Sequence, residues 1–572
     1  MAVIGIDLGT TNSLAGVWQD GKVVLIPNAF GEYLTPSVVG IGKNQEVFVG
    51  SVAKEMLATQ PYDTFREFKR NMGTNFLYGN GRKKYRAEEL SAFVLRRLKD
   101  AEKFLGEEVT EAVISVPAYF DDNKRNATKN AGRLAGLKVE RLINEPSAVA
   151  LKHHTAEKGA ESFIVFDFGG GTLDVSLVEA FDNVVEIQAV AGDNYLGGKD
   201  FNEIIAQDFY EQNQISEAYL TKNEQENVLK EAVKKELTDK NEAERQVYIK
   251  GEAYTLKMTN QRLIHLSAEL FSRMAKPIAK VINMVGIELE ELDKVILVGG
   301  SSKMPVVQQY IKGLLGDKVP VVLEENPDES VAYGVGMAAA IKERTGDIKD
   351  MLLTDICPFS LGTELYDGSF SPVIEKNETL PCKRTMYYTT VRNNQITMNF
   401  PIYQGENIKA SDNLKIGEIN LKRLPKAPEG EQVVKVTFIY DINGILDVNI
   451  ESSVEKVHKV IVNKQIGLSE KELEKRVEQL EKMPLHPWEK EENRLLFEKA
   501  ERLYEQTTPK NRQVIQECLR YFKELLINTK GRKVRQEYVH IMAILDYIEQ
   551  NQVDFGPYNE TFWQEEEEDT DE

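Results

Sequence analysis

The sequence predicts a multidomain chain in which an α/β domain is followed by an antiparallel β-sandwich and then by an α-helical segment. Three observations lead to this prediction. Apolar strand patterns alternate with helical patterns over residues 1–345, period-2 alternation with turn signals occupies residues 356–467, and helical periodicity resumes from residue 468. The chain has 572 residues, which exceeds the size of a single hydrophobic core and agrees with several domains.

Composition and charge limit the classes of function. The formal net charge is −20, which argues against nucleic acid as a partner because phosphate contacts need clustered Lys and Arg. The cysteines are far apart in sequence and indicate neither a disulfide framework nor a zinc site. No apolar run is long enough to span a membrane, and the first residues do not resemble a signal peptide. We therefore expect a cytoplasmic protein without a membrane partner.

In the α/β region, one sequence motif occurs in two similar copies, at residues 3–13 and at residues 163–176. In each copy an apolar strand ends in Asp, and a glycine-rich turn with Thr leads into a second strand-like stretch. Glycine permits a tight turn whose N–H groups form an anion cradle, and the neighbouring Asp suits a hydrated, metal-bound phosphate. A third strand ends in Gly299-Gly300, where the backbone can approach a flat group closely. The repeat predicts two related lobes that close on one nucleotide.

The segments that follow the α/β region have their own signals. Residues 350–355 place three apolar residues between acids, which predicts either a short edge strand or a segment that docks on the first domain. Asn443-Gly444 between two apolar runs predicts a hairpin. Ser469 with Glu472 predicts a capping box at a helix start, and a helix break is expected near Thr508-Pro509. We expect the apolar residues of 490–549 to form a helix-bundle core.

Several longer phrases give the chain a resemblance to the heat-shock-70 (DnaK-type) chaperone family over nearly its whole length. They are Val116–Asp122, Ile143–Ala148, Leu196–Phe201 and Asn326–Gly334. The resemblance implies an actin- and hexokinase-like ATPase domain over 1–345, an interdomain linker over 346–355, a peptide-binding β-sandwich over 356–467, a helical lid over 468–553 and an acidic, disordered tail over 554–572. The compact lid resembles the bacterial HscC-like branch of the family.

The resemblance implies that the first domain binds ATP or ADP with Mg²⁺ and K⁺. The metal positions are Asp7, Asp167 and Asp174, and Mg²⁺ is expected to be reached mostly through water. The nucleotide-binding residues are Gly9, Thr10, Thr11, Asn12, Gly169, Gly170, Gly171, Thr172, Gly197, Glu231, Lys234, Lys235, Thr238, Gly299, Gly300, Ser301, Lys303 and Asp328. Lys303 and Lys235 depart from the arginines of other members. Since an ammonium cannot stack as a guanidinium does, we expect weaker nucleotide binding.

The resemblance also assigns catalytic and coupling roles. Lys69 matches the catalytic lysine that orients the attacking water, although a Lys in such a run is ordinarily a solvated surface residue. Glu145 matches the acid near that water, and Thr172 matches the hydroxyl that contacts the γ-phosphate. The catalytic residues are therefore Lys69, Glu145, Thr172 and Asp167. The allosteric residues are Pro117, Arg125, Leu352 and Leu353. Without the resemblance, Pro117 would be interpreted as a turn proline and Arg125 as a solvated helix arginine.

In the β-sandwich, the resemblance places six residues around a peptide groove. They are Thr363, Tyr366, Tyr388, Val391, Met398 and Phe400. Tyr366 and Val391 match the two positions that arch over the peptide. Met398 stands where a smaller β-branched residue is usual, so we hypothesise a shallower pocket and a narrower choice of clients.

We therefore predict an ATP-dependent chaperone, part of the stress response, that binds and releases exposed hydrophobic segments of client polypeptides. Arg141, Asn144 and Asp355 match positions around the J-domain contact, so a J-domain co-chaperone is an expected partner, and a nucleotide-exchange factor is a further one. Two alternatives use the same fold: a small-molecule kinase and a filament-forming actin relative. The sandwich, linker and lid count against both.

Overall fold

The computed structural model describes residues 2–551, except for 43, 80–83, 154–158, 222–223, 226–227, 229–231, 251, 345–347, 349, 455, 461–469, 486–490, 508 and 529–531. Three of the expectations above fall outside the described residues. They are the cap at Ser469, the nucleotide contact of Glu231 and the disorder of the 554–572 tail.

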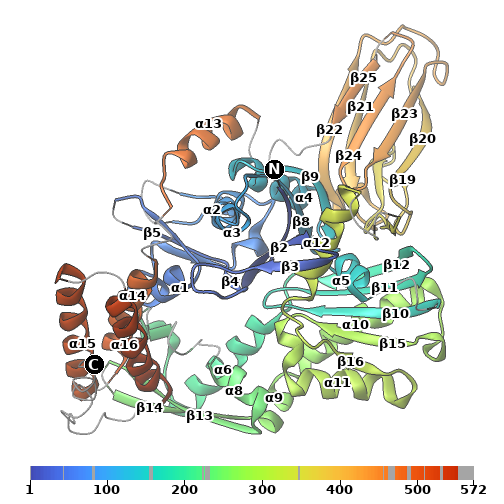
Figure 1. Cartoon of the computed structure of the whole chain (residues 1–572). Helices are drawn as coiled ribbons and strands as arrows, with labels where there is room; N and C mark the ends of the chain where they lie inside the picture. The colour runs from blue at the N-terminus through green and yellow to red at the C-terminus, as the bar shows by residue number, and fades with distance from the viewer. Residues whose placement is uncertain are drawn as a thin grey trace.

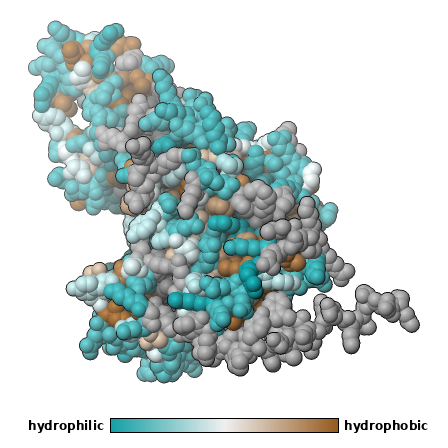
Figure 2. Space-filling model, turned by 90° about the vertical axis from the view of Figure 1, so that its left-hand side faces the viewer, coloured by the Kyte–Doolittle hydropathy of each residue, from teal (hydrophilic) through white to brown (hydrophobic). Residues whose placement is uncertain are grey.

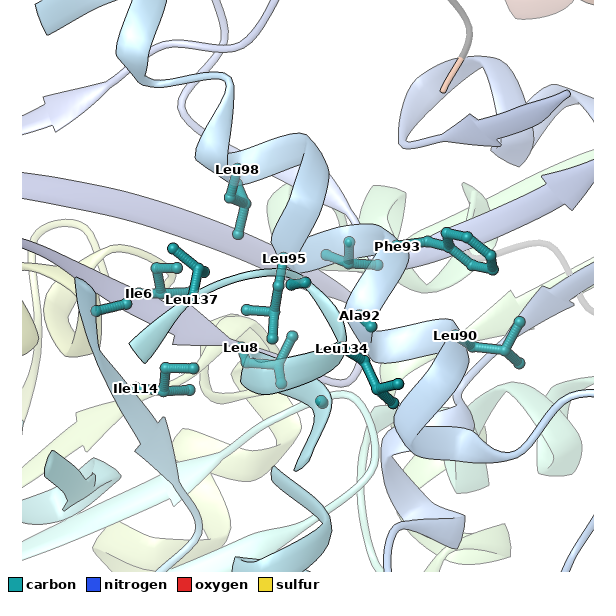
Figure 3. Packing of buried hydrophobic residues seen from close by; sticks show 14 of the residues in the cluster. Ile6, Leu8, Leu90, Ala92, Phe93, Leu95, Leu98, Ile114, Leu134 and Leu137 are labelled. Atoms are coloured by element: carbon teal, nitrogen blue, oxygen red, sulfur yellow. The ribbon is translucent and has the colours of Figure 1, made fainter. Parts of the chain in front are cut away.

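The first lobe contains a six-stranded sheet in the order β3-β2-β1-β8-β9, with β4 paired to β2. β1 is antiparallel to β2 and parallel to β8. Leu90, Phe93 and Leu95 of helix α2 pack in one buried cluster with Ile6 and Leu8 of β1 (Figure 3). The elements of this lobe are β1 Ala2–Leu8, β2 Asn12–Gln19, β3 Lys22–Ile26, β4 Thr35–Pro36, β5 Val38–Ile41, β6 Val47–Val49, α1 Ser51–Thr59, β7 Thr64–Arg66, α2 Ala87–Lys99, α3 Glu102–Leu105, β8 Val109–Val116, α4 Asp122–Leu134 and β9 Lys138–Asn144.

The second lobe repeats this topology in the sheet β16-β15-β10-β11-β12-β17. β10 is antiparallel to β11 and parallel to β15, as β1 is to β2 and β8. The two similar sequence phrases therefore occupy equivalent positions in two similar sheets. The elements are β10 Glu161–Phe168, β11 Leu173–Phe181, β12 Val184–Asp193, α6 Gly198–Asn213, α8 Ala232–Asp239, β13 Glu242–Ile249, β14 Glu252–Thr259, α9 Asn260–Leu266, α10 Ala268–Val285, β15 Lys294–Val298, α11 Pro305–Leu315, β16 Val321–Leu323 and β17 Leu352–Thr354.

The sequence pattern predicts that residues 202–292 are largely helical and polar, but the span also contains two strands. β13 and β14 form an antiparallel hairpin within this span. Ala243, Val247 and Ile249 are buried on one face of β13, which is the period-2 pattern of a half-buried strand. Because the intervening positions are charged or polar, composition alone concealed this alternation.

Helices α5 (Glu145–His153) and α12 (Ser330–Lys342) join the two lobes. Their common buried cluster includes Val113 of the first sheet and Val165 of the second. The helices cross so closely that a Cβ added at Gly334 would lie 1.8 Å from the carbonyl oxygen of Ala148. Only glycine permits this approach, so the relative position of the lobes depends on backbone contact at the crossing.

The third part of the chain is an antiparallel sandwich that extends away from the two lobes (Figure 1). Its sheets, β19-β18-β21-β22 and β20-β23-β24-β25, share one buried core that includes Phe400, Phe438 and Tyr440. The hairpin expected at Asn443-Gly444 joins β23 to β24. The strands are β18 Leu361–Glu364, β19 Phe370–Ile374, β20 Cys382–Thr389, β21 Thr397–Gln404, β22 Leu414–Lys422, β23 Val433–Tyr440, β24 Leu446–Glu451 and β25 Lys456–Val460.

The C-terminal helices divide into two groups, which lie at separate places on the first lobe (Figure 1). α14 (Glu491–Gln506), α15 (Pro509–Asn528) and α16 (Arg532–Asn551) share a core that includes Leu496, Phe522 and Leu545, as expected of a bundle. α13 (Glu470–Glu481) does not join this core. Its Leu473 and Leu480 are buried instead in the cluster of the first lobe.

Candidate functional site

The two glycine-rich turns meet between the lobes. The first, Gly9–Thr11, connects β1 to β2, and the second, Gly169–Thr172, connects β10 to β11. A Cβ added at Gly170 would lie 1.9 Å from Thr11 Oγ1, and one added at Gly171 would lie 2.8 Å from Thr10 Cγ2. The glycines are therefore needed for close approach as well as for turning. The fold brings together cradles that are 160 residues apart in sequence.

Lys69 and Glu145 form a buried ion pair beside the turns. The Nζ–Oε1 distance is 2.6 Å, and the two residues are 5% and 6% exposed. Burial by itself would lower the pKa of Lys69, but the negative charges of Glu145 and Asp7 outweigh burial and hold that pKa above its ordinary value. Lys69 is thus a charged, buried cation beside the turns, and the interpretation of it as a solvated surface lysine is wrong.

Three carboxyl groups, those of Asp7, Asp167 and Asp174, are buried in the same region. Burial and then the charge of Glu145 raise the pKa of Asp7 to about 7 and that of Asp174 to about 7, and the same two causes hold the pKa of Asp167 well above its ordinary value. So many acids around one lysine form a strongly negative environment. A divalent cation would relieve it and restore the ionised carboxylates.

These carboxyl groups fit a hydrated cation better than a fully ligated one. Within the described residues, no three Asp, Glu, His or Cys side chains are grouped closely enough to hold an ion directly. Asp7 Oδ1 accepts a hydrogen bond from Ser115 Oγ at 2.7 Å, and Asp174 Oδ1 accepts one from the amide of Tyr119 at 3.1 Å. Mg²⁺ dehydrates reluctantly and is often held through its water ligands, so the geometry suits that ion.

A second group of predicted residues lies where α6, α8 and the turn after β15 meet. Lys234 Nζ donates to the carbonyl of Gly198 at 3.0 Å, and a Cβ at Gly198 would lie 2.2 Å from Ser301 Oγ. Lys303 Nζ donates to Asp328 Oδ2 at 2.5 Å, so the lysine pairs with an acid. The structure therefore brings these residues together beside α6, α8 and the turn after β15.

Two of the residues predicted to bind nucleotide, Thr238 and Lys235, do not join this group. Thr238 Oγ1 donates to the carbonyl of Lys234 at 3.5 Å within α8, and Lys235 is exposed.

Gly299 has φ +81°, and a Cβ there would lie 2.6 Å from Asp167 Oδ1. The glycine pair after β15 thus makes room beside the carboxyl groups.

Arg70 was not identified from the sequence. Its Nε donates to the carbonyl of Gly171 at 2.9 Å, and its Nη2 lies 3.3 Å from Asp200 Oδ2. Asp200 also accepts a hydrogen bond from the amide of Gly197 at 2.6 Å. Arg70 therefore ties the second cradle to the first lobe. Nothing in the run around Lys69 distinguishes it from a surface arginine.

The segment between the two lobes and the sandwich forms strand β17. It is parallel to β12 at the edge of the second sheet, with Leu353 opposite Val185. Leu353 packs against the cluster between the lobes, whereas Leu352 is 61% exposed. The edge-strand and docking interpretations therefore describe the same contact, in which only one of the two leucines is held.

Arg125 connects the lobes to the sandwich. It is 3% exposed, so the interpretation of Arg125 as a solvated helix arginine is wrong. Its guanidinium donates to Asn144 Oδ1 at 2.7 Å and to the carbonyl of Asn443 in the sandwich at 3.3 Å. Asn144 Nδ2 donates in turn to Asp355 Oδ1 at 2.7 Å, next to β17. A helix, a strand end, the linker and the sandwich thus share one buried network. Pro117, the other residue of the first lobe that was predicted to be allosteric, directly follows β8.

The six residues predicted for a peptide groove separate into two groups. Thr363, Met398 and Phe400 are buried, and Tyr388 contacts Phe400 with ring centroids 5.6 Å apart. Tyr366 and Val391 are exposed on loops. Tyr387, the neighbour of Tyr388, is 67% exposed and was not predicted. Successive side chains of a strand alternate between faces, so Tyr388 packs inward against Phe400 while Tyr387 faces solvent.

The two facing cradles, the buried lysine and the buried carboxyl groups define a two-lobed protein suited to a nucleoside triphosphate. A family model described as Hsp70 protein matches residues 3–551. The chain belongs to the Hsp70 family. It is therefore an ATP-dependent chaperone with an actin-like ATPase domain, and its family uses ATP, ADP and Mg²⁺, binds client polypeptides and works with J-domain co-chaperones. Over the described residues, no helix is both long and apolar enough to cross a membrane.

Proposed function

We propose that this chain binds exposed hydrophobic segments of clients and that ATP controls its affinity for them through contact between the ATPase domain and the sandwich. The observation that supports this most directly is the pairing of β17 with β12. A linker that adds a strand to the ATPase sheet ties the sandwich to that sheet. A nucleotide that changes the arrangement of the lobes therefore changes the affinity of the sandwich for its client. By linkage, a bound client changes the affinity for nucleotide by the same factor.

Hydrolysis in this proposal depends on Lys69, Glu145, Thr172 and Asp167. Lys69 orients the attacking water and offsets the charge that develops on the γ-phosphate, since its ammonium is buried where electrostatic interactions are strong. Glu145 holds Lys69 in place at 2.6 Å. The peptide N–H groups of the two cradles bind the phosphates. Asp7 and Asp167 would hold the waters of a Mg²⁺ ion, which would supply further charge neutralisation.

The helical segment is proposed to act as a lid that is held away from the sandwich in this arrangement. Arg97 Nη2 of the first lobe lies 2.6 Å from Glu491 Oε1 of α14, and both side chains are buried. Arg502 of α14 pairs with Glu55 of α1. These contacts keep α14 on the ATPase domain, which leaves the loops of the sandwich uncovered. Release of the lid after hydrolysis would then trap a client.

The test is the dissociation rate of a fluorescent hydrophobic peptide, measured with ADP and again after addition of ATP, Mg²⁺ and K⁺. We expect a large acceleration by ATP that Leu353→Asp abolishes, because the variant places a charge in the cluster between the lobes. Leu352→Asp is the matched control, since that side chain is 61% exposed and should tolerate the charge. An acceleration that survives Leu353→Asp would contradict coupling through β17.

Further details are proposed on the resemblance. The chain is assigned to an HscC-like bacterial branch with a cytoplasmic location and a role in the stress response. K⁺ is assigned to sites near Asp7, Asp167 and Asp174, and a nucleotide-exchange factor is a proposed partner. The small-molecule kinase is not favoured by the family match. Release of free phosphate in proportion to ATP loss, without any acceptor, would separate the chaperone from a kinase.

A further inference from the structure

Two loops of the sandwich are joined by a contact between Tyr366 and Arg392. The first loop follows β18, and the second lies between β20 and β21. The Arg392 guanidinium lies 5.6 Å from the centre of the Tyr366 ring, and its Nη2 donates to the Tyr366 hydroxyl at 3.4 Å. Tyr366 is nevertheless 72% exposed. The pair, called here the Tyr366–Arg392 clamp, is therefore accessible to a ligand from solvent.

The second loop holds its shape through hydrogen bonds. Gln395 Oε1 accepts from the amide of Val391 at 2.9 Å, and Gln395 Nε2 donates to the carbonyl of Thr397 at 2.9 Å. The amide of Leu424 donates to the carbonyl of Ile396 at 3.0 Å. Arg392 is thus presented from an ordered loop. This lowers the conformational entropy that a ligand contact would cost.

The charge of Arg392 has no acidic partner in the part of the sandwich that the structure describes. The guanidinium contacts the ring and the hydroxyl of Tyr366. The nearest acid in sequence to that ring, Asp367, accepts instead from the amide of Ser369 at 3.0 Å and from its hydroxyl at 2.5 Å. An arginine whose plane contacts an aromatic ring keeps N–H donors at its edge, which can bind a carboxylate in bidentate fashion.

The loops that carry the clamp also expose apolar side chains. Leu365, Val391 and Ile396 lie on these loops and are 39%, 40% and 48% exposed, and Tyr387, which is 67% exposed, lies on β20 before the second loop. Exposed apolar side chains on the loops that carry the arginine offer contacts to an apolar ligand. Apolar patches are also visible among hydrophilic residues on the sandwich in Figure 2. The ligand that fits is an apolar segment with a negative charge.

The charge of the whole sandwich permits such a ligand. The chain has a net charge of −20, but residues 356–467 contain 13 Asp and Glu and 13 Lys and Arg, so the acidic excess lies elsewhere. An acidic peptide therefore meets no net negative charge on the sandwich as a whole.

We propose that the Tyr366–Arg392 clamp gives the sandwich a preference for apolar client segments that carry Asp or Glu beside the apolar core. This inference rests on the proposed function, because it names the class of client that the proposed peptide-binding sandwich selects. Tyr366 and its apolar neighbours contact the apolar part of the segment. The Arg392 guanidinium donates to the carboxylate.

The experiment uses the full chain with ADP and three fluorescent peptides that share one apolar core and differ only in flanking Asp, Asn or Lys. Fluorescence anisotropy gives each Kd. We expect the Asp-flanked peptide to bind about threefold or more tightly than the Asn-flanked one, as for a partly exposed charge pair. Arg392→Gln should remove this ratio, and Arg392→Glu should reverse it in favour of the Lys-flanked peptide.

Lys456→Gln is the matched control. It removes one positive charge from β25, which is the far edge of the sheet that contains β20, and Lys456 is exposed. It should leave the ratio unchanged. Equal binding of all three peptides, or a ratio that persists in Arg392→Gln, would overturn the inference and leave the proposed function intact. Failure of every peptide to bind with either nucleotide would instead overturn the proposed function, and the inference with it.

Discussion

Asp122 is expected to make contact between the ATPase domain and the sandwich dependent on pH. It is the first residue of α4 and is 1% exposed, and its amide donates to Gln404 Oε1 of β21 at 3.2 Å. Burial and then the charge of Asp121 raise the pKa of Asp122 from 3.8 to about 8, while Arg125 partly opposes the change. When the sandwich separates, this carboxyl group meets water and its pKa returns toward the ordinary value.

The sign follows from linkage. The docked form binds a proton that the separated form has already lost above pH 3.8, so docking takes up a proton between pH 3.8 and about 8. Docking is therefore favoured at low pH and weakens as pH rises through this window. The equilibrium constant falls by about tenfold per pH unit, or about 1.4 kcal/mol, and levels off above the raised pKa.

Asp122→Asn keeps the shape of the side chain and removes its ionisation. We expect the variant to dock equally well from pH 6 to 8, whereas the parent loses ATP-accelerated peptide release over the same range. Stopped-flow peptide dissociation with ATP at pH 6, 7 and 8 measures this. Asp121→Asn is a graded comparison: asparagine preserves the N-cap that Asp121 forms with the amide of Lys124 at 3.0 Å, but loss of the Asp121 charge should lower the pKa of Asp122 and move the pH profile to lower pH without abolishing it. Identical pH profiles for the parent and Asp122→Asn would refute the reasoning.

Three other predictions concern single residues of the site and sandwich. Lys69→Gln should lower ATP turnover by about 100-fold, because it removes the buried cation that the proposed mechanism places at the γ-phosphate. Peptide binding with ADP should persist, and single-turnover and peptide-binding assays check the two expectations. Lys303→Arg should tighten ATP binding severalfold, because a guanidinium released from Asp328 offers a planar group that can stack on adenine. Calorimetry with ATP measures the Kd, and an unchanged Kd would argue against stacking at this position. Met398→Val should cost about 1 kcal/mol in the free energy of unfolding because Met398 is 9% exposed. If Met398 also limits the pocket, the variant should change the order in which a panel of peptides binds, and an identical ranking would contradict that hypothesis.

Local signals in the sequence account for much of the fold. Each cradle needs only a strand, an Asp and a few glycines close together in sequence, so the pattern is visible without the tertiary structure. The sandwich strands and the helix break before Pro509 are visible for the same reason, since turn residues and periodicity are local. The hairpin β13–β14 was missed because its charged positions concealed a buried face.

The tertiary structure decided which polar residues are buried and what they meet. Lys69 and Arg125 resemble surface residues in sequence, yet they are 5% and 3% exposed because segments far along the chain cover them. Leu353 rather than Leu352, and Tyr388 rather than Tyr387, is the more buried of the two, because only one face of each strand packs inward. The sequence alone thus determined the parts and their phosphate chemistry. Only the packing of distant segments decided burial, pairing and charge balance, because desolvation depends on every element that surrounds a side chain.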